Sequence, residues 1–226
     1  TYGDIISGSY PLTASISVDR YGTSLSDSKK SVLYALKNTL NYYTKLSPEY
    51  AYSSSARNLE SEKINLISIP SIFYGSSIDK GSVRLKFYVT GTLLAEAADT
   101  KRNGELVQTS GSTTGNVVGT VLYNEGFIVL TASAALSEHG EVYDSLNTDG
   151  STPSPVSASW YTFGVTGSAT NSTGSSFSID FKGIQRVNTV TMFAEADRNQ
   201  LNFSNNPTFL STGSIPHKTG SGHYTE

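Results

Sequence analysis

A hydrolytic triad in this chain of 226 residues would have to use one of only three histidines. His139 lies in the run Ser137-Glu138-His139-Gly140-Glu141, where an acid–base pair can be drawn. No Gly-x-Ser-x-Gly elbow is present to supply a serine nucleophile. His217 and His223 lie in a tail rich in Gly and Ser, a poor scaffold for a site that needs sub-ångström geometry. We interpret the run around His139 as a polar loop between strands.

Carboxylates offer two further kinds of site. A glycosidase pair could be sought among Glu96, Asp99, Glu105, Glu125, Glu138 and Glu141, but spacing along the chain does not give their separation in space. The run that begins at Asp99 partly matches a calcium loop, yet Lys101 stands at position three and Ser110 at position twelve, where ligands are required. We interpret residues 99–105 as a hairpin turn. The sequence therefore predicts no metal site, no cofactor and no enzymatic activity.

Composition narrows the remaining classes of function. The net charge is −3, and the compact basic pair Lys29 and Lys30 begins a helical pattern, so we expect no nucleic-acid binding. The absence of cysteine excludes disulfides and thiolate chemistry. Only 15% of residues are charged, below the roughly 25% typical of soluble domains. Uncharged hydroxyls and amides are easier to desolvate than Lys or Glu, so this composition favours a protein whose surface contacts other proteins.

Membrane and targeting segments are not indicated. The sequence contains no run of about 18 apolar residues, and residues 1–10 lack the basic and apolar regions of a signal peptide. We therefore expect a soluble protein without membrane contact. Because the chain begins with Thr1, we expect it to be a processed product or a segment of a longer protein.

The elements that would position any site are mostly strands. Apolar residues at helical spacing predict one amphipathic helix over residues 27–46, which ends before Pro48. Val83 to Val89 alternates apolar and polar residues, the pattern of a half-buried strand. Further strands are predicted at these places: Val117 to Tyr123, Phe127 to Thr131, Ser157 to Val165 with Trp160, Phe177 to Phe181, and Val187 to Ala194. Hairpin turns are predicted at Asn103-Gly104 and Asn124-Glu125-Gly126.

Short strands with frequent Gly, Asn and Ser turns indicate an all-β or β-dominated protein, which we interpret as an antiparallel β-sandwich with one N-terminal helix. We predict an N-terminal arm over residues 1–25, a sandwich domain over 26–203 and an extended C-terminal arm over 204–226. Apolar residues of the two arms need a surface to cover them. The predicted interface residues are Ile5, Ile6, Tyr10, Leu210 and Ile215.

Three runs of the sequence resemble a known group of proteins. They are Asn38 to Pro48 (NTLNYYTKLSP), Ile67 to Ile78 (ISIPSIFYGSSI) and Val121 to Leu130 (VLYNEGFIVL), and Asn205-Asn206-Pro207-Thr208 fits as well. They resemble virion structural proteins of contractile-tailed bacteriophages, especially those that infect marine cyanobacteria. The similarity covers residues 38–208 and carries no catalytic signature. It implies a virion component in the tail, neck, baseplate or a fibre.

Three functions from different classes remain. The first is a virion structural protein that assembles with copies of itself and with other virion proteins, through edge strands and arms. The second is a host-surface carbohydrate-binding module, in which Trp160 or some of the 14 tyrosines would stack on a host glycan. A glycan-cleaving enzyme that uses a loop carboxylate such as Glu138 is a third interpretation. Weak charge, missing catalytic motifs and low-complexity arms favour the first.

Overall fold

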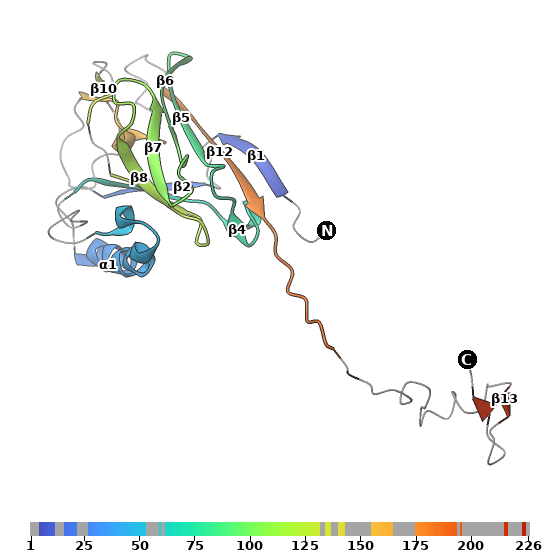
Figure 1. Cartoon of the computed structure of the whole chain (residues 1–226). Coiled ribbons are helices and arrows are strands. Elements are labelled where there is room, and N and C mark those ends of the chain that lie inside the picture. The colour runs from blue at the N-terminus through green and yellow to red at the C-terminus, as the bar shows by residue number, and fades with distance from the viewer. Residues whose placement is uncertain are drawn as a thin grey trace. The chain divides into compact units, whose positions relative to one another are not determined.

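In the part of the chain that the structure describes, residues with period-two alternation form a long antiparallel sheet, accompanied by one α-helix (Figure 1). The computed structural model describes residues 5–11, 16–21, 27–52, 59, 62–131, 134–136, 140–142, 155–164, 175–193, 195, 215–216 and 223–224. The chain divides into two units, residues 1–187 and 188–226. The protein is therefore β-dominated, as the sequence predicts.

The first unit contains most of the elements. Its strands are β1 (Ile5–Pro11), β2 (Ser17–Tyr21), β3 (Ile64–Ser68), β4 (Ser77–Ile78), β5 (Arg84–Val89), β6 (Thr92–Ala98), β7 (Glu105–Ser110), β8 (Val117–Leu122), β9 (Phe127–Leu130), β10 (Gly140–Val142), β11 (Pro155–Ser157) and β12 (Ser175–Ile184). Its helices are α1 (Asp27–Tyr42) and the 3₁₀ helices η1 (Tyr43–Lys45), η2 (Pro48–Tyr50), η3 (Ser71–Phe73) and η5 (Trp160–Thr162). In the second unit, β13 (Ile215–Pro216) pairs with β14 (His223–Tyr224). No helix in the described part of the chain is long and apolar enough to cross a membrane.

The main sheet has the strand order β1-β12-β5-β6-β7-β8-β9-β3-β2, and β4 pairs with β12 beside this path. Strands β5 to β9 form a meander, in which each strand pairs antiparallel with the next along the chain. Strands β12 and β1 extend one end, and β3 and β2 extend the other. The two outermost strands, β1 and β2, thus come from residues that the sequence assigned to an N-terminal arm. The predicted limits of the terminal arms stay predictions.

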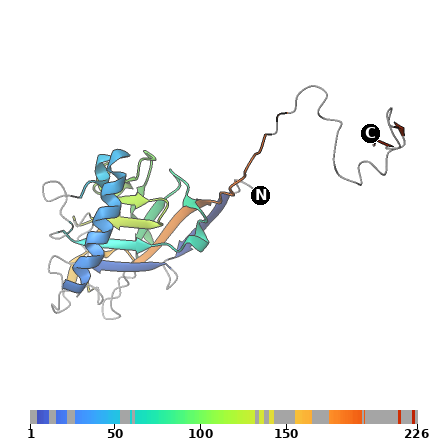
Figure 2. The same cartoon turned by 90° about the horizontal axis from the view of Figure 1, so that it is seen from below.

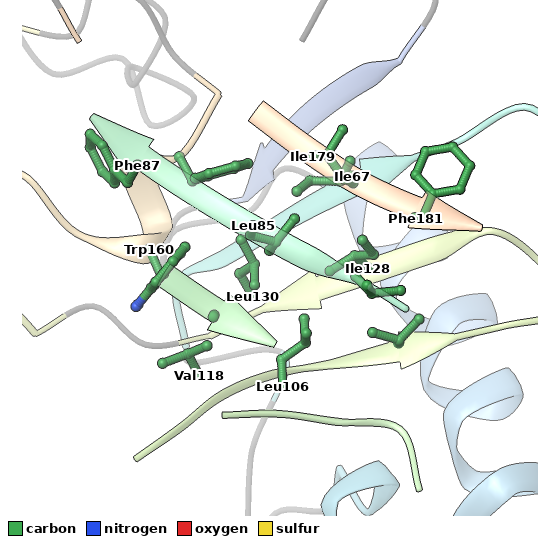
Figure 3. Packing of buried hydrophobic residues seen from close by; sticks show 14 of the residues in the cluster. Ile67, Leu85, Phe87, Leu106, Val118, Ile128, Leu130, Trp160, Ile179 and Phe181 are labelled. Carbon is green, nitrogen blue, oxygen red and sulfur yellow. The ribbon is translucent and has the colours of Figure 1, made fainter. Parts of the chain in front are cut away.

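The inner face of the sheet encloses the larger core. Ile67 of β3 and Ile179 of β12 belong to the same buried cluster, although five strands separate β3 from β12 in the sheet order. Figure 3 shows Ile67 beside Ile179, with Leu85 of β5 and Leu130 of β9 nearby. The sheet must therefore curl strongly, so that its own two ends supply opposite walls of the core.

The outer face of β3, β9 and β8 is covered by α1, which lies across the strands in Figure 2. Leu33, Leu36 and Leu40 point from the helix into this second cluster, at the spacing that places them on one helical face. Strand β3 is consequently buried on both faces, which explains its nearly continuous apolar run. Each fully buried side chain of this kind contributes roughly 1.5–3 kcal/mol of hydrophobic stabilisation.

The predicted two-sheet sandwich is not confirmed, because the strands around the core belong to a single curled sheet. Alternation of apolar and polar residues cannot distinguish a two-sheet sandwich from a single curled sheet, since both architectures bury one face of each strand. The helix prediction is confirmed, with the 3₁₀ helix η1 as the last turn of the predicted range. The hairpin prediction at Asn124-Glu125-Gly126 is also confirmed, and Gly126 has the positive φ of 73° expected there.

Three local predictions are wrong. Asn103-Gly104 is not the predicted tight two-residue turn: residues 99–104 connect β6 to β7, and Arg102 and Gly104 have the positive φ, 59° and 96°. The interpretation of residues 99–105 as a hairpin turn is confirmed, because β6 and β7 pair antiparallel. Trp160 lies in η5 and not in a strand, because Thr162 donates from its N–H and its hydroxyl to the Ser159 carbonyl oxygen and so closes a 3₁₀ turn. Residues 185–193 form no strand, since no described segment pairs with them.

Candidate functional site

A cavity of about 460 Å³ opens at the end of the sheet where β4, β12 and the β8–β9 turn meet η1 and η2. Its wall combines aromatic, aliphatic and charged side chains. These are Tyr43, Tyr50 and Tyr123; Leu46, Ile78, Leu122 and Ile184; Lys80, Arg102, Arg186 and Asp79; and Ser77 and Asn124. The lining thus carries three cations and one carboxylate, although the whole chain has a net charge of −3.

The cations come from three places in the fold: Lys80 precedes β5, Arg102 precedes β7 and Arg186 follows β12. Arg102 is held in a left-handed conformation, and its Nε donates to the Lys80 carbonyl oxygen at 2.9 Å. The Lys80 ammonium lies 5.7 Å from the centre of the Tyr123 ring, in a cation–π contact. Arg186 lies two residues after the end of β12, and its backbone N–H donates to the Ser76 hydroxyl at 3.0 Å. The side-chain contacts of Arg102 and Lys80 position these two basic groups without neutralising them.

Behind this wall, the buried Asp99 carboxylate joins three segments of the chain. Its Oδ2 accepts hydrogen bonds from the Gly81 N–H at 2.7 Å and from the Tyr123 hydroxyl at 2.9 Å, and its Oδ1 accepts from the Val83 N–H at 3.0 Å. Burial raises the pKa of Asp99, and these hydrogen bonds oppose that shift. Burial and the Asp99 charge raise the pKa of Tyr123, so the phenol stays protonated. The network fixes the turns and leaves no free base.

Asp99→Asn should lower the free energy of unfolding by about 2 kcal/mol, because an amide cannot replace both carboxylate oxygens as acceptors. In either amide orientation the NH₂ group faces at least one of the donors on Gly81, Tyr123 and Val83. Urea denaturation at pH 7 measures the change. Asp19→Asn, at an exposed position of β2, is the matched control and should change stability by less than about 0.5 kcal/mol. Equal effects at the two positions would contradict the structural role of Asp99.

Tyr50 and Tyr43 complete the aromatic side of the cavity. The Tyr50 hydroxyl donates to the Val121 carbonyl oxygen at 2.5 Å, and burial raises the pKa of this residue. The half-buried Tyr43 donates to Glu125 Oε1 at 2.6 Å, and burial followed by this bond raises the pKa of Tyr43. Leu46, at the end of η1, is 59% exposed. The cavity therefore has an apolar side without cover and a basic side.

A second candidate feature is the apolar segment Val187–Phe193, which follows β12. Val190, Met192 and Phe193 are 87%, 89% and 93% exposed. The alternation of Val190 and Met192 with Thr189 and Thr191 is that of a half-buried strand, but no described segment pairs with it. Several large apolar residues exposed within one short segment are typical of a surface that binds another protein.

The predicted interface residues are not brought together in one described site. Ile5, Ile6 and Tyr10 lie in β1, paired with Ile184, Gly183 and Ile179 of β12. Ile215 lies in β13, opposite Tyr224. Leu210 is outside the described residues. Whether these five residues form an interface stays a prediction.

Residues proposed for chemistry are only partly placed. Glu138, His139 and His217 are outside the described residues, and His223 lies in β14. No group of three or more possible metal ligands occurs in the part of the chain that the structure describes. Trp160 cannot stack on a sugar, because it is 1% exposed and its Nε1 donates to Gln108 Oε1 at 2.9 Å. The carbohydrate-binding alternative therefore cannot use Trp160, the only tryptophan in the sequence.

Comparison of the chain with protein-family models, curated proteins and solved structures finds no match. The function must accordingly be inferred from the residues and their arrangement. Among the described residues, the basic, tyrosine-lined cavity and the exposed apolar segment Val187–Phe193 are the features suited to binding a partner.

Proposed function

We propose that this chain is a non-enzymatic structural protein of a bacteriophage virion, part of the tail, neck, baseplate or a fibre, which assembles with copies of itself and with other virion proteins. The observation that carries the proposal is the apolar segment Val187–Phe193. Its three most exposed apolar residues, Val190, Met192 and Phe193, have no cover in the described chain. Burying such side chains against a partner gains roughly 1.5–3 kcal/mol each.

Three further features support assembly. The strands β1 and β2 end the strand order, so each has one side without a partner among the described strands. Open edges can accept a strand from another subunit, with main-chain hydrogen bonds as the source of affinity. A charged fraction of 15% lowers the cost of desolvating the surface. The resemblance of residues 38–208 to phage virion proteins supports the location in a particle.

We also infer that the curled sheet serves as the equivalent of a two-layer sandwich. The support is the composition of the larger core, which joins Leu85 of β5 and Ile179 of β12 to Ile67 of β3 and Leu130 of β9. The two ends of the sheet then act as facing layers. Such a core is rigid enough to carry arms and edges that bind neighbouring subunits.

Val190→Ser/Met192→Ser/Phe193→Ser should weaken self-association at least tenfold, because it removes the exposed apolar side chains of the segment. Light scattering of the full chain over a range of concentrations measures the change in mass. The melting temperature should stay the same, since none of the three residues contributes to a buried core.

The matched control is Thr189→Ser/Thr191→Ser, which changes the alternate positions of the same segment and should leave the mass unchanged. If the triple serine variant assembles as the wild type does, the segment is not the assembly surface. Retention of a glycan by the monomeric wild-type chain would instead favour the carbohydrate-binding alternative.

A further inference from the structure

We propose that the segment Val187–Phe193, with Glu195 behind it, docks into the basic, tyrosine-lined cavity of a second copy of this chain. The inference rests on the proposed function and adds to it the acceptor surface. It joins two features that have no partner among the described residues: an apolar segment followed by an acid, and a cavity with an apolar side and a basic side.

The cavity suits one or two large side chains. Its volume of about 460 Å³ falls within the roughly 300–1,000 Å³ of ligand pockets. Leu46 at its rim is 59% exposed, so an apolar side chain placed there would cover it. Tyr43, three residues before Leu46, also lines the cavity and adds an aromatic ring, against which a phenylalanine can pack edge to face for about 0.5–1.5 kcal/mol. Phe193 and Met192 are large apolar side chains, which suit the apolar, aromatic side of the cavity.

The charges are complementary as well. Lys80, Arg102 and Arg186 line the cavity, and none of them forms a salt bridge to a described carboxylate. Asp99 and Glu125, which lie behind the lining, already accept hydrogen bonds from Tyr123 and Tyr43. Glu195 is exposed and lies two residues after Phe193. With Phe193 in the cavity, Glu195 can reach the basic side.

A second copy is a better donor than the same chain. Arg186 lines the cavity and Val187 begins the segment, so the chain would have to reverse direction within a few residues to insert Phe193 into its own cavity. Residues 187–193 contain no Gly or Pro to favour such a reversal. A second copy meets no such restriction.

Head-to-tail docking has a consequence for the assembly. Each copy would use one donor segment and one acceptor cavity, which are different surfaces, so the interface is heterologous. Heterologous contacts build a ring when the rotation between subunits closes, and a helical filament when it does not. Both are modes of assembly suited to a structural subunit.

Two variants of the full chain test the docking. The acceptor variant Leu46→Asp/Arg186→Glu replaces an apolar and a basic residue of the cavity lining with acidic residues. The donor variant Met192→Asp/Phe193→Asp replaces two apolar residues of the segment with acidic residues. All four residues are exposed, so both variants should keep the wild-type melting temperature. Each variant alone should associate at least tenfold more weakly than the wild type in light scattering. The matched control Ile72→Asp/Lys182→Glu makes the same changes at exposed residues outside the cavity lining, and it should assemble as the wild type does.

Mixing the two variants gives the decisive measurement. The donor variant keeps an intact cavity and the acceptor variant keeps an intact segment, so an equimolar mixture should form a species of twice the monomer mass and nothing larger. A mixture that stays monomeric overturns the docking. If the donor variant is monomeric but the acceptor variant assembles as the wild type does, assembly through the segment stands and the cavity is not its acceptor. A wild-type chain that is monomeric at every concentration overturns the docking and self-assembly together.

Discussion

Replacing Asn65 with aspartate should lower the free energy of unfolding at pH 7 by about 3–5 kcal/mol, the range found when an uncompensated charge is left in a protein interior. Asn65 lies in β3 and is fully buried. Its Nδ2 donates to three carbonyl oxygens, those of Trp160 at 3.1 Å, Tyr161 at 3.2 Å and Phe163 at 2.7 Å. A carboxylate at this place would face three acceptors and offer no donor.

This amide holds η5 in position. The Trp160 ring and the Phe163 ring both belong to the larger core, with their centroids 5.7 Å apart. Phe163 also packs edge to face on Phe177 of β12, at 5.1 Å. Loss of the Asn65 amide would therefore loosen the 3₁₀ segment and the aromatic group that closes one end of the core.

The effect of Asn65→Asp should depend on pH in a stated direction. The introduced carboxyl has a pKa of about 3.9 in the unfolded chain, and burial beside carbonyl oxygens raises it in the folded protein. Between these two values the folded state binds more protons, so the stability of the variant falls as pH rises, by about 1.4 kcal/mol per pH unit. The difference from the wild type should be smallest near pH 4 and largest at neutral pH.

Urea denaturation of both proteins between pH 4 and pH 8 tests this prediction. Asn38→Asp, the same change on an exposed position of α1, is the control and should alter stability by less than about 0.5 kcal/mol at any of these pH values. A difference between Asn65→Asp and the wild type that does not change with pH would mean that the amide does not face the three carbonyl groups.

The sequence predicts those elements whose pattern is local. Arg84–Val89 alternates because one face of β5 is buried and the other is wet, and Leu33, Leu36 and Leu40 repeat because one face of α1 lies on the sheet. Such periodicity follows from burial of one face, and it can be read without knowing the partner.

The remaining features depend on contacts between distant residues. Asn65 interrupts an apolar run, and nothing in its neighbours indicates that it binds carbonyl groups 95 to 98 positions further along the chain. The residues that line the cavity come from five separate stretches between Tyr43 and Arg186, so no local sequence motif predicts the cavity. Val187–Phe193 alternates apolar and polar residues as a half-buried strand does. This pattern does not indicate whether the surface that would bury its apolar side belongs to the same chain or to another.

Gly104→Ala should lower the free energy of unfolding by about 3 kcal/mol, through backbone strain of about 1 kcal/mol and steric overlap that typically costs 1–3 kcal/mol. Gly104 has a φ of 96°, which an alanine adopts only with strain. A β-carbon added there would overlap the ring and the hydroxyl of Tyr50, which is buried and bonded to the Val121 carbonyl oxygen. Tyr50 has to move, and the aromatic wall of the cavity moves with it.

Gly115→Ala separates the two contributions. Gly115 has nearly the same φ, 94°, but a β-carbon added there meets nothing within 4 Å, so this variant should lose only the backbone strain of about 1 kcal/mol. In the Tyr50→Ala background the overlap is gone, and Gly104→Ala should then cost no more than Gly115→Ala. Thermal and urea denaturation of the single and double variants complete the cycle. Because Tyr50 lines the cavity, Gly104→Ala should also weaken self-association if a second copy docks there, whereas Gly115→Ala should leave it unchanged. Equal costs for the two alanines in the wild-type background would show that Tyr50 does not pack against Gly104.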